Sequence, residues 1–166
     1  MVEVELAAVR VDLQSNTPVV LLQETGGAKR TLPIFIAAPE ATSIAFALQG
    51  LDPPRPMTHD LMKDLLVVLG ATLERVVITE LRSGTYFAEL RLNLDGSSRI
   101  VSSRPSDAIA LAARTDAPLY VADDILEAEG VVLADDDEDA DSNNPDELVQ
   151  EFKEFLNVVR PEDFSS

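Results

Sequence analysis

The sequence contains no cysteine, which excludes disulfide bonds and thiolate metal sites. It also has no run of about 18 apolar residues, the length that a membrane-spanning helix requires. The first residues show no basic segment followed by a hydrophobic core, which is the pattern of a secretory signal. These absences predict a cytoplasmic protein that does not enter a membrane.

Several common catalytic signatures are missing as well. The sequence has no phosphate-binding glycine loop, no nucleophile elbow and no histidine-rich zinc signature. His59 is the only histidine, so it is the only candidate for proton transfer near neutral pH. A lone histidine is more often a structural hydrogen-bonding residue, and the sequence leaves both roles open.

The charge is concentrated at one end of the chain. The net charge is −17, but residues 123–166 hold 16 acids against Lys153 and Arg160 alone. The first 122 residues are nearly balanced, so the overall acidity is weak evidence against a nucleic-acid ligand. With 46% hydrophobic residues the chain is not disordered as a whole. We expect a domain over residues 1–133, a flexible acidic linker over 134–145, and an amphipathic helix with a tail over 146–166.

The apolar pattern predicts an α+β fold with a largely antiparallel or mixed sheet and three packed helices. Helices are expected over 39–49, 59–69 and 105–114, with a short helical turn over 124–128. In the second helix, Thr58 is the expected N-cap, and Leu61, Leu65, Val68 and Leu69 form the expected buried side. Pro33 indicates an edge strand, and a change of phase near Ala8 indicates a bulge in the first strand. Strands are expected over 1–13, 18–23, 30–37, 71–81, 85–94, 99–102 and 119–121.

The segment 103–114 combines charge with small apolar residues. Pro105 suits the first helical position, and Asp107 lies where the helix dipole favours a carboxylate. Arg104, Asp107 and Arg114 fall within one narrow arc of the helix, and four alanines allow close packing on another side. The arginines are either ion-pair partners of Asp107 or ligands for phosphate, and the spacing does not decide between these roles.

Three expected helices begin with an acid in or near the first turn, namely Glu40, Asp60 and Asp107. Compensation of the helix dipole explains each acid individually. The neighbouring Arg55, His59 and Arg104 favour a second interpretation. Carboxylates that bind Mg²⁺ or Mn²⁺, arginines on phosphate oxygens and a histidine that moves a proton form a phosphodiesterase site.

The expected C-terminal helix has Leu148, Phe152, Phe155 and Leu156 at helical spacing. It docks on its own domain or on a sister subunit, or it contacts a foreign protein partner. In a further alternative, the acidic tail competes with nucleic acid for a basic surface.

Four segments together resemble the bifunctional nuclease family, long known as a domain of unknown function. They are Leu32-Pro-Ile-Phe-Ile36 followed by Glu40-Ala41, Arg55-Pro-Met-Thr-His-Asp-Leu61, Gly84-Thr-Tyr-Phe-Ala88 and Arg104-Pro-Ser-Asp-Ala-Ile-Ala-Leu-Ala112. The resemblance covers about residues 1–130. It implies an α+β fold with a largely antiparallel sheet, dimers or higher oligomers, and action on both DNA and RNA.

The leading hypothesis is therefore a metal-dependent nuclease that hydrolyses phosphodiester bonds of DNA and RNA. Its predicted catalytic residues are His59, Asp60 and Asp107, and its predicted metal ligands are Glu40, Asp60 and Asp107. The predicted phosphate-binding residues are Arg55, Arg104 and Arg114. The alternative is a non-catalytic regulatory or protein-interaction module of the same fold.

Overall fold

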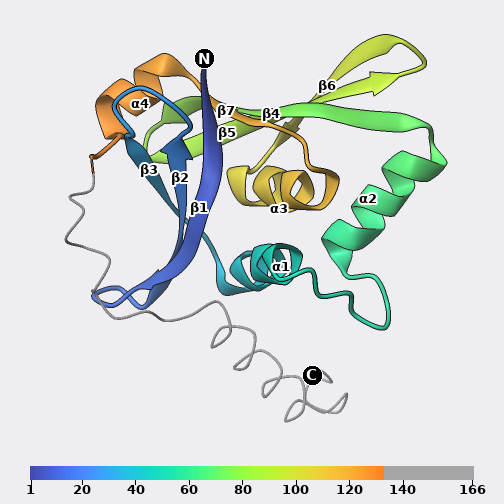
Figure 1. Ribbon diagram of the computed structural model, residues 1–166, viewed down its shortest axis with the longest axis horizontal. Helices are drawn as coiled ribbons and strands as arrows, with labels where there is room; N and C mark the ends of the chain where they lie inside the picture. Colours follow the sequence, from blue (N-terminus) through green and yellow to red (C-terminus); the bar gives the residue numbers. More distant parts are fainter. Residues whose placement is uncertain (133–166) are drawn as a thin grey trace.

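The computed structural model describes residues 1–132, which form a seven-stranded mixed sheet and four helices (Figure 1). The expected α+β class is confirmed, and the expected short helical turn near residue 124 is the fourth helix. None of the described helices has the length and hydropathy needed to cross a membrane. The elements are β1 (Val2–Asp12), β2 (Thr17–Glu24), β3 (Thr31–Phe35), α1 (Ala38–Leu48), α2 (Thr58–Val68), β4 (Ala71–Arg82), β5 (Thr85–Leu94), β6 (Ser97–Ser103), α3 (Pro105–Thr115), β7 (Leu119–Val121) and α4 (Asp123–Glu129).

The sheet consists of two antiparallel meanders joined by one short strand. Its order is β3-β2-β1-β7-β4-β5-β6, and β7 pairs antiparallel with β1 and parallel with β4. Pro33 lies on the edge strand β3, as expected, where its missing N–H is tolerated. The expected bulge in β1 is confirmed by a register shift between Leu6 and Ala8. Three residues of β7 thus hold the two halves of the domain in one sheet.

Two tight turns of the second meander follow local sequence. Ser83 and Gly84 connect β4 to β5 with φ values of 50° and 76°, and Asp95 and Gly96 connect β5 to β6 with φ values of 51° and 77°. Two successive residues with positive φ define the hairpin turn whose twist matches that of the strands. These turns join the strands expected over 71–81, 85–94 and 99–102 into antiparallel hairpins.

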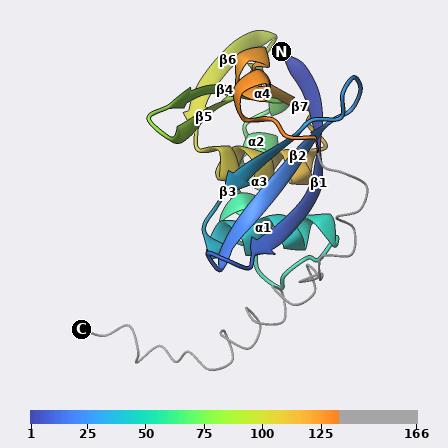
Figure 2. The same ribbon diagram turned by 90° about the vertical axis from the view of Figure 1, so that its left-hand side faces the viewer.

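The hydrophobic core lies between the sheet and helices α1 and α3. Figure 1 shows these two helices side by side on one side of the sheet, and Figure 2 shows them behind the strands of the first meander. Ala108, Ala110 and Ala112 are almost completely buried in α3, so their small side chains let neighbouring elements approach closely. Helix α2 packs on α3 and β4, and α4 packs on β3.

The expected orientation of α2 is wrong. Leu61 and Leu65 are each 50% exposed and Val68 is 80% exposed, whereas the buried residue of this helix is His59. Met62 and Leu66, on the neighbouring face of the helix, are packed against the core. The N-cap is Met57 instead of Thr58. The amphipathic pattern identified an apolar stripe correctly, but this stripe does not face the domain's own core.

The boundary after residue 133, the acidic linker over 134–145 and the C-terminal helix over 146–166 lie outside the described residues. They stay predictions from the sequence.

The first testable prediction compares two leucines of the first hairpin. Leu22 is fully buried in β2, whereas Leu13, in the turn between β1 and β2, is 72% exposed. Leu22→Ala should lower the free energy of unfolding by about 2–5 kcal/mol, because it leaves a cavity in the core. Leu13→Ala should change it by less than about 0.5 kcal/mol. Urea unfolding midpoints would measure both, and equal effects would contradict the placement of the core.

Candidate active site

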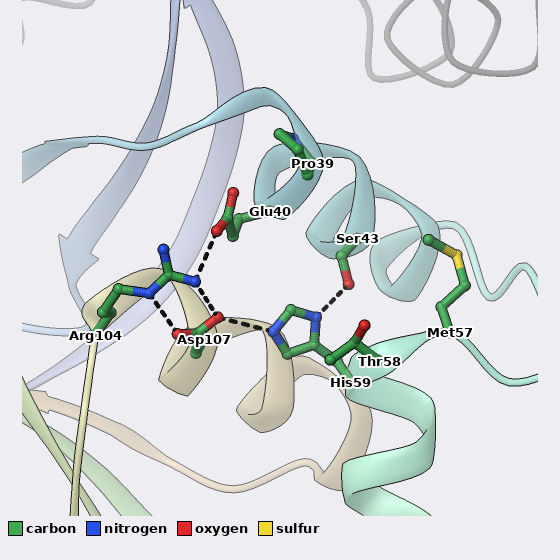
Figure 3. A pocket seen from close by; sticks show the side chains of 8 residues that line it. All are labelled: Pro39, Glu40, Ser43, Met57, Thr58, His59, Arg104 and Asp107. Carbon is green, nitrogen blue, oxygen red and sulfur yellow. Dashed lines mark hydrogen bonds and ion pairs between the residues drawn. The ribbon is translucent and has the colours of Figure 1, made fainter. Parts of the chain in front are cut away.

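The first turns of three helices surround one pocket. Its volume is about 220 Å³, and it is open to solvent. Helix α1 contributes its beginning, α2 its N-cap and first turn, and α3 its N-cap and first turn, although these segments lie far apart in the sequence. Because first helical turns carry free N–H groups and partial positive charge, they favour an anion in the pocket. The lining residues are Pro39, Glu40, Ser43, Met57, Thr58, His59, Arg104 and Asp107 (Figure 3).

Arg104 connects the two carboxylates of the pocket. Its Nε and Nη2 donate to the two oxygens of Asp107 at 2.7 and 2.9 Å, and Nη2 also lies 2.7 Å from Glu40 Oε1. The Arg104 side chain is 65% exposed, whereas the Glu40 side chain is only 13% exposed. Arg104 thus offers a solvent-facing guanidinium that two carboxylates hold in place.

His59 continues this network into the interior. Its Nε2 lies 3.1 Å from Asp107 Oδ1, and its Nδ1 lies 2.8 Å from Ser43 Oγ. The histidine is only 6% exposed and Ser43 only 2%. Figure 3 shows the imidazole between the serine of α1 and the aspartate of α3. Both ring nitrogens therefore have a hydrogen-bonding partner.

The network stabilises the charged forms of Asp107 and Arg104. Burial acts to raise the pKa of Asp107, but hydrogen bonds from Arg104 and His59 outweigh it, so the pKa lies below its ordinary value. The hydrogen bond to Asp107 and the contact with Glu40 raise the pKa of Arg104. Asp107 is consequently an ionised hydrogen-bond acceptor at neutral pH.

A second ion pair lies next to the pocket. Arg114 Nε donates to Asp60 Oδ1 at 2.5 Å, while the other two guanidinium nitrogens donate to the carbonyl oxygens of Ser43 and Ala110 at 3.0 and 2.9 Å. The Arg114 side chain is only 7% exposed. Burial acts to raise the pKa of Asp60, but the hydrogen bonds from Arg114 and from the Met57 N–H keep it below its ordinary value. One guanidinium therefore joins α1, α2 and α3.

The structure brings together some of the residues predicted from the sequence and separates others. Glu40, His59, Arg104 and Asp107 line the pocket, whereas Asp60 and Arg114 form their own pair outside its lining. Arg55 is exposed and does not line the pocket either.

The predicted metal ligands do not form one cluster. Glu40 and Asp107 contact Arg104, while Asp60 contacts Arg114. Within residues 1–132, no three His, Asp or Glu side chains are placed to hold a metal ion. The set Glu40, Asp60 and Asp107 therefore does not fit a single ion in this arrangement, and we derive no chemical step through a metal.

Ser43 is a pocket residue that the sequence motifs do not indicate. The sequence signal that could have identified Ser43 is its spacing of three residues from Glu40, because residues i and i+3 lie on the same face of a helix. Its hydroxyl bonds to a histidine 16 residues away, a contact that only the tertiary structure shows.

Comparison with known proteins identifies the class to which this fold and site belong. Residues 20–134, more than half of the chain, match the family model described as the bifunctional nuclease domain, so the protein is related to nucleases. The chain belongs to the bifunctional nuclease domain family, which confirms the resemblance seen in its motifs.

Two groups of relatives differ in how much they share with the chain. An uncharacterized protein of Mycobacterium tuberculosis is 42% identical over 167 residues, which cover 100% of this chain and 99% of that protein. Bifunctional nuclease 1 of Oryza sativa is 29% identical over 105 residues, or 61% of this chain and 32% of the rice protein. Bifunctional nuclease 2 of Arabidopsis thaliana is 28% identical over 119 residues, or 70% of this chain and 36% of the plant protein. The matched region spans about a third of these plant nucleases.

The second testable prediction concerns the Asp60–Arg114 pair. Arg114→Met should lower the free energy of unfolding by about 3 kcal/mol, because it leaves a largely buried carboxylate without its partner. The double variant Asp60→Asn and Arg114→Met should lose less than Arg114→Met alone. A double-mutant cycle in urea would measure the coupling, and strictly additive effects would contradict a direct pair.

The same pair makes stability depend on pH in a defined direction. A carboxylate whose pKa is lower in the folded than in the unfolded state stabilises the fold above the unfolded value of about 3.9. This contribution is lost as the pH falls through the lower folded pKa of Asp60. The double variant should show a smaller loss of stability than the parent over this acidic range.

Proposed function

We propose that the protein hydrolyses phosphodiester bonds of DNA or RNA in the pocket between α1, α2 and α3. The observation that carries this proposal is the convergence of three first helical turns, one exposed arginine and the only histidine of the chain on a single pocket. The membership in a nuclease family supports it. The plant relatives are named bifunctional nucleases, which supports nucleic acid as the substrate.

Arg104 is the residue that we expect to bind the substrate phosphate. A guanidinium donates paired hydrogen bonds to oxyanions, and Arg104 is exposed while Glu40 and Asp107 fix its position. The first turns of the helices add partial positive charge. The volume of the pocket suits a phosphate and its neighbouring atoms, and it is smaller than the roughly 300–1,000 Å³ of typical pockets for whole small molecules.

His59 is the residue that we expect to move the proton. Hydrolysis requires a proton to leave the attacking group and a proton to reach the leaving oxygen. Asp107 orients the imidazole through Nε2 and stabilises it when it becomes protonated. The two carboxylates and one arginine of the pocket leave one net negative charge. A proton on His59 would offset this charge when a phosphate binds.

Dependence on Mg²⁺ or Mn²⁺ stays part of the proposal. Glu40 and Asp107 are the carboxylates of the pocket, and carboxylate oxygens suit both ions. Phosphate binding by Arg55 and Arg114 is a prediction from the sequence alone. We retain the cytoplasm as the proposed compartment because a chain without cysteine suits a reducing environment.

The third testable prediction concerns hydrolysis of labelled single-stranded DNA and RNA by the highly purified full chain. His59→Gln and Asp107→Asn, each checked for folding, should cleave at least about 100-fold more slowly than the parent. Asp95→Asn, in the turn between β5 and β6 away from the pocket, should cleave at the parental rate. Parallel reactions with Mg²⁺, Mn²⁺ or EDTA test the metal dependence.

A rate that is equal in parent and site variants would contradict this proposal. Cleavage would then arise from a contaminant or another surface, and the non-catalytic alternative would be favoured. A specific observation supports that alternative: the charged groups of the site already satisfy one another, and α2 presents an exposed apolar face. The predicted protein partner of the C-terminal helix belongs to the same alternative.

We also propose that the apolar face of α2 joins two copies of the chain. This face consists of Leu61, Leu65, Val68 and Leu69, which are 50–80% exposed. In an antiparallel, two-fold contact between two α2 helices, Leu61 of one copy faces Leu65 of the other.

The fourth testable prediction is the oligomeric state measured by light scattering after gel filtration. The parent should elute as a dimer or higher oligomer, and Leu65→Glu should be monomeric because it places a charge in the apolar contact. Leu13→Glu, which changes an exposed leucine far from α2, should keep the parental mass. A monomeric parent would refute this use of the α2 face.

A further inference from the structure

The contact between Ser43 and His59 is not used by the hydrolysis described above. The Asp107 carboxylate only accepts hydrogen bonds, so the hydrogen between it and the imidazole belongs to His59 Nε2. Neutral His59 therefore has an unprotonated Nδ1, which accepts the Ser43 hydroxyl hydrogen over 2.8 Å. This geometry makes Nδ1 the base of the pair and Ser43 the group on which it acts.

The hydroxyl of Ser43 is directed differently from that of its neighbour. Hydroxyl groups within helices commonly donate to the carbonyl four residues earlier, and Thr42 does so to Ala38 at 2.9 Å. Ser43 instead donates to His59, and its own carbonyl oxygen accepts a hydrogen bond from Arg114. Tertiary contacts thus hold both the backbone and the side chain of Ser43 at the pocket.

We propose that Ser43 is a nucleophile that attacks a phosphate ester bound in the pocket and forms a phosphoserine intermediate. The choice of a nucleic-acid phosphodiester as its substrate rests on the proposed function, whereas the reactivity of the serine does not. Serine, histidine and aspartate together form the arrangement that activates a hydroxyl in hydrolases on unrelated folds. Here the nitrogens are exchanged, because Nδ1 faces the serine and Nε2 faces the aspartate.

The reaction has two balanced steps. In the first, Ser43 Oγ bonds to phosphorus, its proton moves to His59 Nδ1, and the bond from phosphorus to the leaving oxygen breaks as that oxygen takes the proton. In the second, a water oxygen attacks phosphorus and gives its proton to Nδ1. The bond from phosphorus to Oγ then breaks, and Ser43 regains its proton. The products are an alcohol and a phosphate monoester, and no oxidant or reductant is needed.

The charged groups around Ser43 and His59 suit these steps. Asp107 stabilises the imidazolium that forms after each proton transfer, and Arg104 fixes Asp107 through two hydrogen bonds. The guanidinium of Arg104 is exposed at the same pocket, where it can donate to the oxygens of the phosphate as negative charge develops.

A phosphorylating probe tests the nucleophile independently of nuclease activity. The full chain is treated with a small alkyl fluorophosphonate, whose fluoride leaves when a serine attacks, and the adduct is located by intact mass and peptide mapping. We expect one adduct per chain, on Ser43, and none at this position in Ser43→Ala. Labelling should slow by about 100-fold in His59→Gln, which lacks the base. Thr42→Val, which removes the adjacent buried hydroxyl, should label at the parental rate.

The outcomes separate this inference from the proposed function. Absence of an adduct on Ser43 in the folded parent overturns the inference, and so does equal labelling of the parent and His59→Gln. Cleavage of DNA or RNA that persists in Ser43→Ala also overturns it, while hydrolysis at the pocket still stands. An adduct on Ser43 that depends on His59, in a protein that cleaves neither nucleic acid, supports the nucleophile and refutes the nuclease proposal.

Discussion

The buried guanidinium of Arg114 is the constraint on which the arrangement of the helices depends. A charged group with only 7% exposure is tolerated when its N–H groups find acceptors, and these acceptors come from Asp60 on α2, Ser43 on α1 and Ala110 on α3. Sliding any one of the three helices along its axis would break at least one of these bonds. The same bonds therefore fix how the first turns of α1, α2 and α3 meet.

Two arginines of one segment serve different purposes because their burial differs. Arg114 lies in the last turn of α3 between helices, whereas Arg104 lies at the N-cap and is 65% exposed. Arg104 lies at the positive end of α3, where a second positive charge is unfavourable, and Glu40 and Asp107 compensate for it. The inner arginine thus organises the pocket, and the outer arginine remains accessible to a ligand.

Local sequence predicted most of the sheet but not the contacts that make the site. The hairpins follow from two-residue turns, and Pro33 indicated its edge strand, because these signals act between near neighbours. The motifs also identified His59 and Asp107. Their pairing across 48 residues depends on how α2 packs on α3, which periodicity does not encode. For the same reason the apolar stripe of α2, including Leu65, was assigned to the wrong environment: a stripe predicts that something covers it but does not say what.

Helix α2 connects the pocket to the outer surface of the domain. Its inner side carries His59 and Asp60, whereas Leu61 and Leu65 are exposed on the other side. A contact that covers the outer side stabilises the folded helix by mass action, since association favours the state that binds. That same state holds the imidazole between α1 and α3. Burial of the apolar stripe would therefore strengthen the geometry of the pocket without any residue of the partner entering it.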